Sequence, residues 1–138
     1  MSAKISYQEL RKEEFIAGLT KIYRYDGYKD IALMLRIIKA VKLINKELES
    51  AQEIYLKLLK QYAKLDAQGN FVPPPGKEVG HGLYCIEESK SEEWIKKQKE
   101  FYETEVELHF DVFAFDAFKD SGLSPAELEA LGVICVPA

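Results

Sequence analysis

The chain has 138 residues, of which 47% are hydrophobic and 30% are charged, a composition typical of one compact domain. No apolar run approaches the roughly 20 residues that a membrane-spanning helix needs, so we expect no contact with a membrane. Met1–Leu10 lacks the apolar stretch of a secretory signal, which predicts a cytoplasmic protein. The two cysteines, Cys85 and Cys135, lie 50 positions apart, and we expect both to be free thiols.

The net charge of −4 conceals two halves of opposite sign. Residues 1–65 carry 13 Lys or Arg and 8 Asp or Glu, a balance of +5, whereas residues 66–138 carry 6 and 15, a balance of −9. These charges can be neutralised within one molecule, between copies of a homo-oligomer, or by separate partners. Counting charges does not distinguish the three cases.

Residues 1–65 are predicted to be helical. Ser6 and Glu9 form the pattern of a capping box, which marks the start of a first helix that ends near the turn Asp26-Gly27. Residues 30–65 contain neither glycine nor proline and predict one long helix. Its apolar residues recur four and three apart and form a heptad stripe: Ile37, Val41, Ile44, Leu48, Ala51, Tyr55, Leu58, Tyr62 and Leu65. The opposite face is charged and should be exposed to water.

The beginning of the long helix is apolar on every side. Ile31, Leu35 and Ile38 lie opposite the heptad stripe, so packing of the stripe cannot cover them. Either the first helix and the C-terminal part of the chain wrap these residues, or a second copy covers them. We expect some wrapping together with a homo-oligomer contact, which makes the three residues candidate interface residues.

Residues 66–88 are predicted to be a loop, because turn residues are followed by the prolines at 73–75. Short extended pieces at 70–72 and 83–87 are expected to flank the Pro-Gly segment as a loose hairpin.

Residues 89–138 are predicted to hold a helix, a strand and a short helix. The elements are a helix from Ser89 or Ser91 to about Glu103, a strand over 105–114, a helix at 125–131 and a short strand at 133–136. The first of these helices is expected to pack antiparallel on the far end of the long helix. The predicted fold class is therefore α+β, in one domain over 1–138. It consists of a long helix in an antiparallel helical hairpin, with a small C-terminal β element and a short helix.

Four phenylalanines lie within residues 110–118. They suit core packing, and they also suit a protein-binding surface, because 112–115 is apolar on both faces and a small sheet rarely covers both. Phe113 and Phe115 are therefore further candidate interface residues.

The sequence holds no recognisable catalytic constellation. His81 and His109 have no partner nearby in the sequence, and together with Cys85 and Glu87 they match no spacing of metal ligands. We therefore predict a protein that is not an enzyme, with no catalytic residues, no metal and no cofactor.

A basic segment with interleaved tyrosines is a candidate nucleic-acid site, because lysines and arginines contact phosphates and tyrosines stack on bases. Its members are Lys21, Tyr23, Arg24, Tyr25, Tyr28, Lys29, Arg36, Lys39, Lys42 and Lys46. The later lysines also fit the solvated face of the long helix, and the pI of about 5.3 argues against a basic footprint. Nucleic acid is therefore not the expected partner.

Four segments, in this order, carry a resemblance to a known family: Ile5–Leu10, Gln61–Asn70, Glu105–Leu108 and Leu123–Leu131. In these segments the chain resembles a family of short, functionally uncharacterised proteins encoded by tailed bacteriophages. That family has no assigned activity, so no functional residue can be carried over. The resemblance implies a phage gene product that is made in the host bacterial cytoplasm.

The expected function is therefore that of a non-enzymatic bacteriophage protein that works through protein–protein contacts, as a virion or morphogenesis component. Its partner would be a phage or host protein, and its location the host cytoplasm or the virion. The alternative is a small acidic inhibitor of a bacterial defence system such as CRISPR or restriction, which presents carboxylates where an enzyme expects nucleic acid. The carboxylates available for this are Glu87, Glu88, Glu92, Glu93, Glu100, Glu103, Glu105 and Glu107.

Overall fold

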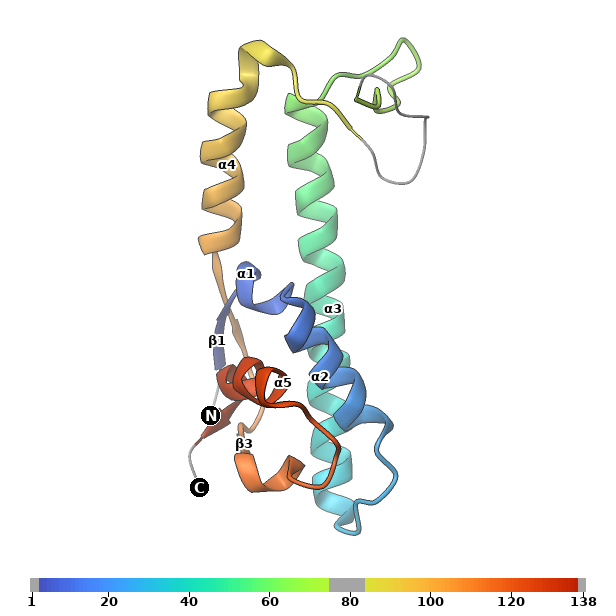
Figure 1. The fold of residues 1–138 in the computed structure, drawn as a ribbon, viewed down its shortest axis with the longest axis vertical. Coiled ribbons are helices and arrows are strands. Elements are labelled where there is room, and N and C mark those ends of the chain that lie inside the picture. Colours follow the sequence, from blue (N-terminus) through green and yellow to red (C-terminus); the bar gives the residue numbers. More distant parts are fainter. Residues whose placement is uncertain (1–2, 75–83, 137–138) are drawn as a thin grey trace. The chain divides into compact units, whose positions relative to one another are not determined.

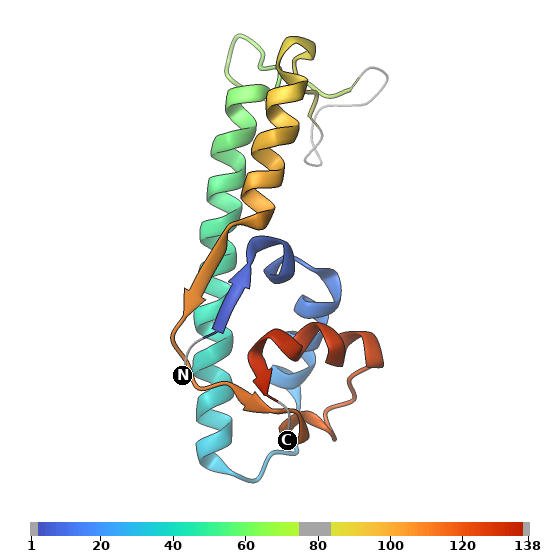
Figure 2. The ribbon, with the colours of Figure 1, turned by 90° about the vertical axis from the view of Figure 1, so that its left-hand side faces the viewer.

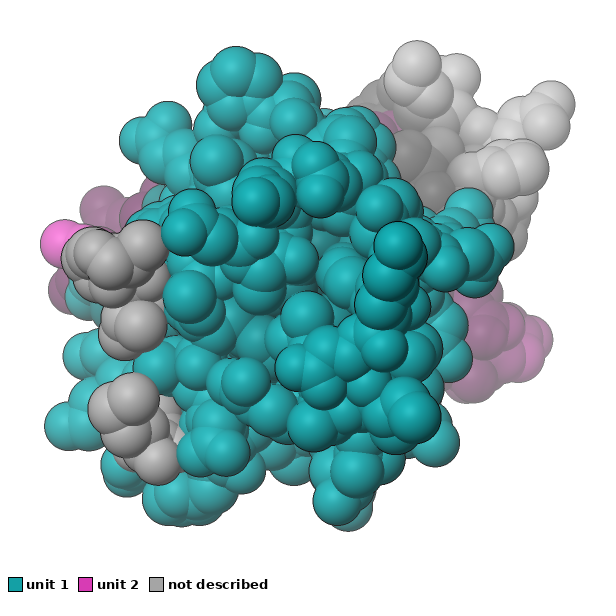
Figure 3. Space-filling model, turned by 90° about the horizontal axis from the view of Figure 1, so that it is seen from below, with its two compact units in different colours: residues 1–49, 103–138 teal, residues 50–102 magenta. Residues whose placement is uncertain are grey.

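The computed structural model describes residues 3–74 and 84–136, which form two compact units. Unit 1 lies within residues 1–49 and 103–138, and unit 2 within 50–102 (Figure 3). Helices and small sheets occur together, so the α+β class is confirmed. The long helix α3 belongs to both units, and the expected single domain stays a prediction.

Unit 1 begins with a strand where the sequence predicted helix. β1 (Ala3–Ser6) pairs antiparallel with β2 (Glu105–Leu108), with Ala3 opposite Leu108 (Figure 2). Ala3, Ile5 and Leu108 are buried, whereas Lys4 is exposed. The alternation along β1 is only four residues long, which is too short to predict a strand directly before a helix cap.

Two short helices replace the single first helix that was predicted. They are α1 (Tyr7–Leu10) and α2 (Glu13–Arg24). The capping box is confirmed, because Glu9 N–H donates to Ser6 Oγ at 3.2 Å and Ser6 N–H donates to the Glu9 carboxylate at 3.1 Å. The helix then breaks at residues 11–12, although neither is glycine or proline.

The predicted strand over 105–114 is also divided. β2 ends at Leu108, and β3 (Phe113–Ala114) pairs with β4 (Cys135–Val136) in a separate parallel sheet. A short 3-10 helix, Phe115–Phe118, follows β3. The C-terminal strand is therefore confirmed, whereas the single long strand is wrong.

The short C-terminal helix α5 (Pro125–Ala130) lies against α2 (Figure 2). Its predicted capping box is confirmed, with Glu127 N–H donating to Ser124 Oγ at 3.1 Å. At Gly18 on α2, an added Cβ would lie 3.0 Å from Leu131 Cδ1, just beyond α5, so glycine permits this close approach.

α3 (Ile31–Tyr62) provides the buried side of unit 1 with its first half. Ile37, Val41 and Ile44 of the heptad stripe are at most 6% exposed, which confirms that part of the stripe. They share the core with side chains that are fully buried: Ile5, Leu10, Phe15, Ile22, Phe113, Phe118, Leu131 and Ile134.

In unit 2, α4 (Ser91–Glu103) lies beside the second half of α3 (Figure 1). The Tyr55 ring is 5.7 Å from that of Trp94 and 5.4 Å from that of Phe101, and Gln98 donates to the Tyr55 hydroxyl at 3.2 Å. Tyr62 contacts Trp94 at 5.7 Å. This cluster forms a second, aromatic core.

The predicted loose hairpin is wrong in its pairing. Phe71 forms a bridge with Leu65, and Ile86 forms a bridge with Ala63, so the described parts of both pieces pair with the chain that follows α3. These bridges end α3 at Tyr62, before the predicted Leu65. The Pro-Gly segment over 75–83, including His81, lies outside the described residues.

Candidate functional site

Three large aliphatic side chains on the first half of α3 are exposed to solvent. Ile31 is 78% exposed, Leu35 51% and Ile38 39%. We call them the apolar face. The spacing of four and three residues puts them on one side of the helix, opposite the buried Ile37 and Ile44. Wrapping by other parts of the described chain therefore does not cover them.

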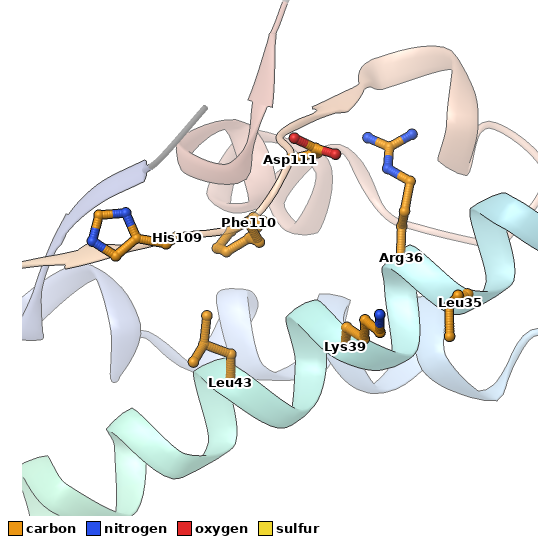
Figure 4. A pocket seen from close by; sticks show the side chains of 7 residues that line it. All are labelled: Leu35, Arg36, Lys39, Leu43, His109, Phe110 and Asp111. Carbon is orange, nitrogen blue, oxygen red and sulfur yellow. The ribbon is translucent and has the colours of Figure 1, made fainter.

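An open groove of about 820 Å³ lies beside the apolar face, between α3 and the segment that follows β2 (Figure 4). We call it the wide groove. It is lined by Leu35, Arg36, Lys39, Leu43, His109, Phe110 and Asp111. Because Leu35 belongs to both, the apolar face and the wide groove form one continuous surface of unit 1.

Arg36 holds the two walls of the wide groove together. Its Nη2 donates to the carbonyl oxygen of Val112 at 2.9 Å, and its guanidinium carbon lies 4.9 Å from the centre of the Phe113 ring. Cation–π contact and a charge-assisted hydrogen bond both favour this position. In Figure 4 the side chain extends from α3 towards the segment that carries Asp111. The wall is therefore held by contacts of unit 1 itself.

The phenylalanines predicted for an interface are not equally accessible. Phe113 is 1% exposed and packs 5.2 Å from Phe118, so this residue belongs to the core and is not presented to a partner. Phe115 is half-buried. The ring that lines the wide groove is Phe110, which alternation had assigned to a continuing strand. Because β2 ends at Leu108, Phe110 lies in the segment after the strand and does not continue the alternation of β2.

Each unit contains one free cysteine. Cys135 is a free thiol, and burial raises its pKa to about 11, which keeps it protonated and weakly nucleophilic at neutral pH. Cys85 is also free, as expected. No group of three or more His, Cys, Asp or Glu within the described residues is arranged to hold a metal ion.

The basic segment with interleaved tyrosines is partly used inside unit 1. Lys21 Nζ lies 2.6 Å from the Glu127 carboxylate. Tyr25 and Tyr28 pack edge to face at 4.7 Å, and burial raises the pKa of Tyr28 to about 12. Lys21 and Arg36 are therefore both engaged in contacts within unit 1.

No helix among the described residues is both long and apolar enough to cross a lipid bilayer. No protein-family model matches this chain, and no curated protein or solved structure is significantly similar to it.

Proposed function

We propose that this chain is a non-enzymatic binding protein that works through protein–protein contacts and associates with a second copy through the apolar face. The observation that carries the proposal is that Ile31, Leu35 and Ile38 stay exposed on a helix whose opposite side is in the core. Contiguous exposed aliphatic surface of this kind marks interaction sites. The wide groove extends the surface with Leu43 and Phe110.

The energetics predict weak association through the apolar face alone. Full burial of one Ile or Leu contributes about 1.5–3 kcal/mol, which, scaled by the exposed fractions, gives about 2.5–5 kcal/mol per copy. A two-fold pair doubles this, against a cost of about 4–15 kcal/mol for joining two molecules. We therefore expect pairing that depends on concentration, with wide-groove contacts adding to it.

We propose further that the second half of α3 and α4 form the antiparallel helical hairpin expected from the sequence. Tyr62 contacts residues 93 and 94, whereas Tyr55 contacts 98 and 101, so sequence numbers rise along one helix as they fall along the other. The two helices of such a hairpin would be held together by the ring contacts of Trp94 with Tyr55 and Tyr62.

The setting that we propose is bacteriophage assembly, as a virion or morphogenesis component with a phage or host protein as partner. Its support is the resemblance in the four segments named above, together with the exposed apolar face. Mass spectrometry of purified virions, and co-purification with head and tail proteins, test this setting. Absence of the protein from both would contradict it.

The alternative, an acidic inhibitor of a defence system, receives less support from the structure. α4 carries four glutamates but also three lysines, so its charge is nearly balanced. Glu93 accepts a hydrogen bond from the Tyr62 hydroxyl at 3.1 Å, and Glu100 lies 3.3 Å from Lys97. Phage plating on hosts with and without defence systems would reveal inhibition if it occurs.

Light scattering after gel filtration tests the association. At high micromolar concentration we expect a species larger than the 15.8 kDa monomer, and the double change Leu35→Glu with Ile38→Glu should return it to monomer. Ile54→Glu with Leu56→Glu is a matched control, because these residues of the same helix are 41% and 39% exposed. A monomeric wild type, or equal effects of the two double variants, would refute the proposal.

A further inference from the structure

A second, smaller groove of about 320 Å³ runs between α2 and α3 within unit 1. We call it the α2–α3 groove. Its lining residues come from one side of each helix: Ile16, Leu19, Thr20, Tyr23 and Arg24 from α2, and Val41, Lys42, Asn45 and Leu48 from α3. It shares no lining residue with the wide groove, so it is a separate surface feature.

All the charged side chains that line the α2–α3 groove are cationic. Arg24 and Lys42 are both exposed, and neither has an ion pair or a side-chain hydrogen bond within the described part of the chain. By contrast, the nearby Lys21 is paired with Glu127, and the wide groove contains Asp111. Among the described residues, the groove therefore carries two cations with no carboxylate paired to either, although the chain has a net charge of −4.

Exposed apolar side chains lie beside these cations. Ile16 is 42% exposed and Tyr23 51%, and they are seven positions apart, so they lie on the same side of α2. Leu19 and Val41, at 4% and 6%, form a buried apolar base. The groove therefore offers an aliphatic and aromatic surface flanked by positive charge.

We propose that the α2–α3 groove docks an acidic amphipathic helix of a partner protein. Apolar side chains of that helix pack against Ile16 and Tyr23, and its carboxylates meet Arg24 and Lys42. A groove between two helices that receives the apolar face of a third is a recurring mode of peptide recognition. Tyr23 lines the groove and is exposed, and tyrosine is among the residue types that most often anchor an interface.

The charges and the aliphatic lining select this occupant. Nucleic acid would use Arg24, Lys42 and Tyr23, but its charged backbone and planar bases cover an aliphatic surface such as Ile16 and Leu48 less well than apolar side chains do. A second copy is a poor match for two reasons. Its α4 exposes Ile95 but carries three lysines as well as four glutamates, and its α5 exposes Leu128 but has only six residues, with Glu127 already paired with Lys21. The proposal is therefore of a distinct acidic partner, and it does not depend on association through the apolar face.

A displayed peptide library tests the proposal with the full-length chain. Peptides of about 16 residues, roughly four helical turns, would carry Leu, Ile, Phe or Met at helical spacing and Glu, Lys, Gln or Ala elsewhere. We expect the wild type to enrich peptides with Glu over those with Lys.

Arg24→Glu with Lys42→Glu should weaken binding of the enriched peptides at least tenfold, because it places like charges together. Tyr23→Ser should weaken it about tenfold.

Two further variants keep the test interpretable. Arg24→Gln with Lys42→Gln removes charge without adding repulsion and should give an intermediate loss, with circular dichroism checking the fold of every variant. Lys57→Glu with Lys60→Glu reverses two exposed lysines in the second half of α3 and should leave binding unchanged.

Three results would overturn the proposal. They are no enriched peptide, enrichment of Lys over Glu, and binding that is indifferent to Arg24 and Lys42. A labelled single-stranded oligonucleotide is the competing probe. The decisive contrary result has two parts: no peptide is enriched, and the oligonucleotide binds the wild type but loses affinity for the Arg24→Glu, Lys42→Glu variant. The groove would then be a nucleic-acid-binding site, and the proposal would be wrong.

Discussion

The two halves of α3 carry the same apolar stripe but differ on the side away from it. In the first half, Ile31, Leu35 and Ile38 share one exposed side of the helix. In the second half, the exposed Ile54 and Leu56 are two positions apart and so do not face the same way. The two halves therefore differ on the off-stripe side: the first half exposes three aliphatic side chains together, and the second half does not.

The largest expected effect concerns the aromatic core beside the second half of α3. Trp94 is 5% exposed and contacts both Tyr55 and Tyr62, so Trp94→Ala should destabilise unit 2 by about 3–5 kcal/mol. Urea unfolding followed by circular dichroism measures the loss. The neighbouring Ile95, which is 64% exposed, provides the control, and Ile95→Ala should stay within about 0.5 kcal/mol. Similar losses in both variants would contradict the assignment of this core.

The next prediction compares two isoleucines in the first half of α3. Ile37 is 2% exposed, so Ile37→Ala should cost about 2–5 kcal/mol through lost burial and a cavity. Ile31 is 78% exposed, so Ile31→Ala should change stability by less than about 0.5 kcal/mol in the monomer. The unfolding midpoints of dilute samples, where association is absent, measure both. A large loss for Ile31→Ala would mean that this side is covered within the chain.

A smaller loss of stability is expected when the serine at the start of a helix is replaced, and the two units differ in this respect. Ser124 Oγ accepts the Glu127 N–H at the start of α5, and Ser124→Ala should cost about 1 kcal/mol. Ser91, the first residue of α4, donates its hydroxyl to the Glu88 carbonyl and does not cap. Ser91→Ala should therefore change the unfolding free energy by under about 0.5 kcal/mol. Equal changes would indicate that the cap at α5 contributes nothing specific.

The smallest effect is a pH dependence within unit 1. The Lys21 ammonium, and then the Ser124 N–H, lower the pKa of Glu127 below its ordinary value. Its ionised form therefore stabilises the fold above the unfolded-state pKa, and this contribution is lost as the pH falls through the lowered folded-state pKa. The stability difference between wild type and Glu127→Gln should shrink on acidification, as urea unfolding at several pH values would show. A constant difference would mean that the pair with Lys21 contributes nothing.

Local patterns were enough to predict the helices with clear boundaries. The capping boxes at Ser6 and Ser124 form as the sequence indicated, because each depends on two residues only three positions apart. The stripe through Ile37 and Ile44 is buried because helical periodicity places it on one side. These features depend on chain neighbours, which the sequence displays directly.

Partners distant in the sequence account for the predictions that were wrong. β1 forms because it pairs with β2, with Ala3 opposite Leu108. That partner is about 100 positions away, so the four residues of β1 do not by themselves indicate a strand. The break at residues 11–12 lets Leu10 and Phe15 both reach the core, although nothing there interrupts a helix by itself. Strand pairing and core packing made these choices.

The sequence by itself determined the long helix, its stripe and the caps, since these follow from spacing along one chain. The tertiary structure decided which apolar residues remain exposed: it buried Phe113 against Phe118 and brought Phe110 beside Leu43 in the wide groove. It also joined Tyr23 and Lys42, from different helices, in the α2–α3 groove. The exposure of a side chain and the residues that line a groove depend on which segments pack together in space. Periodicity along the chain does not indicate which distant segments these are.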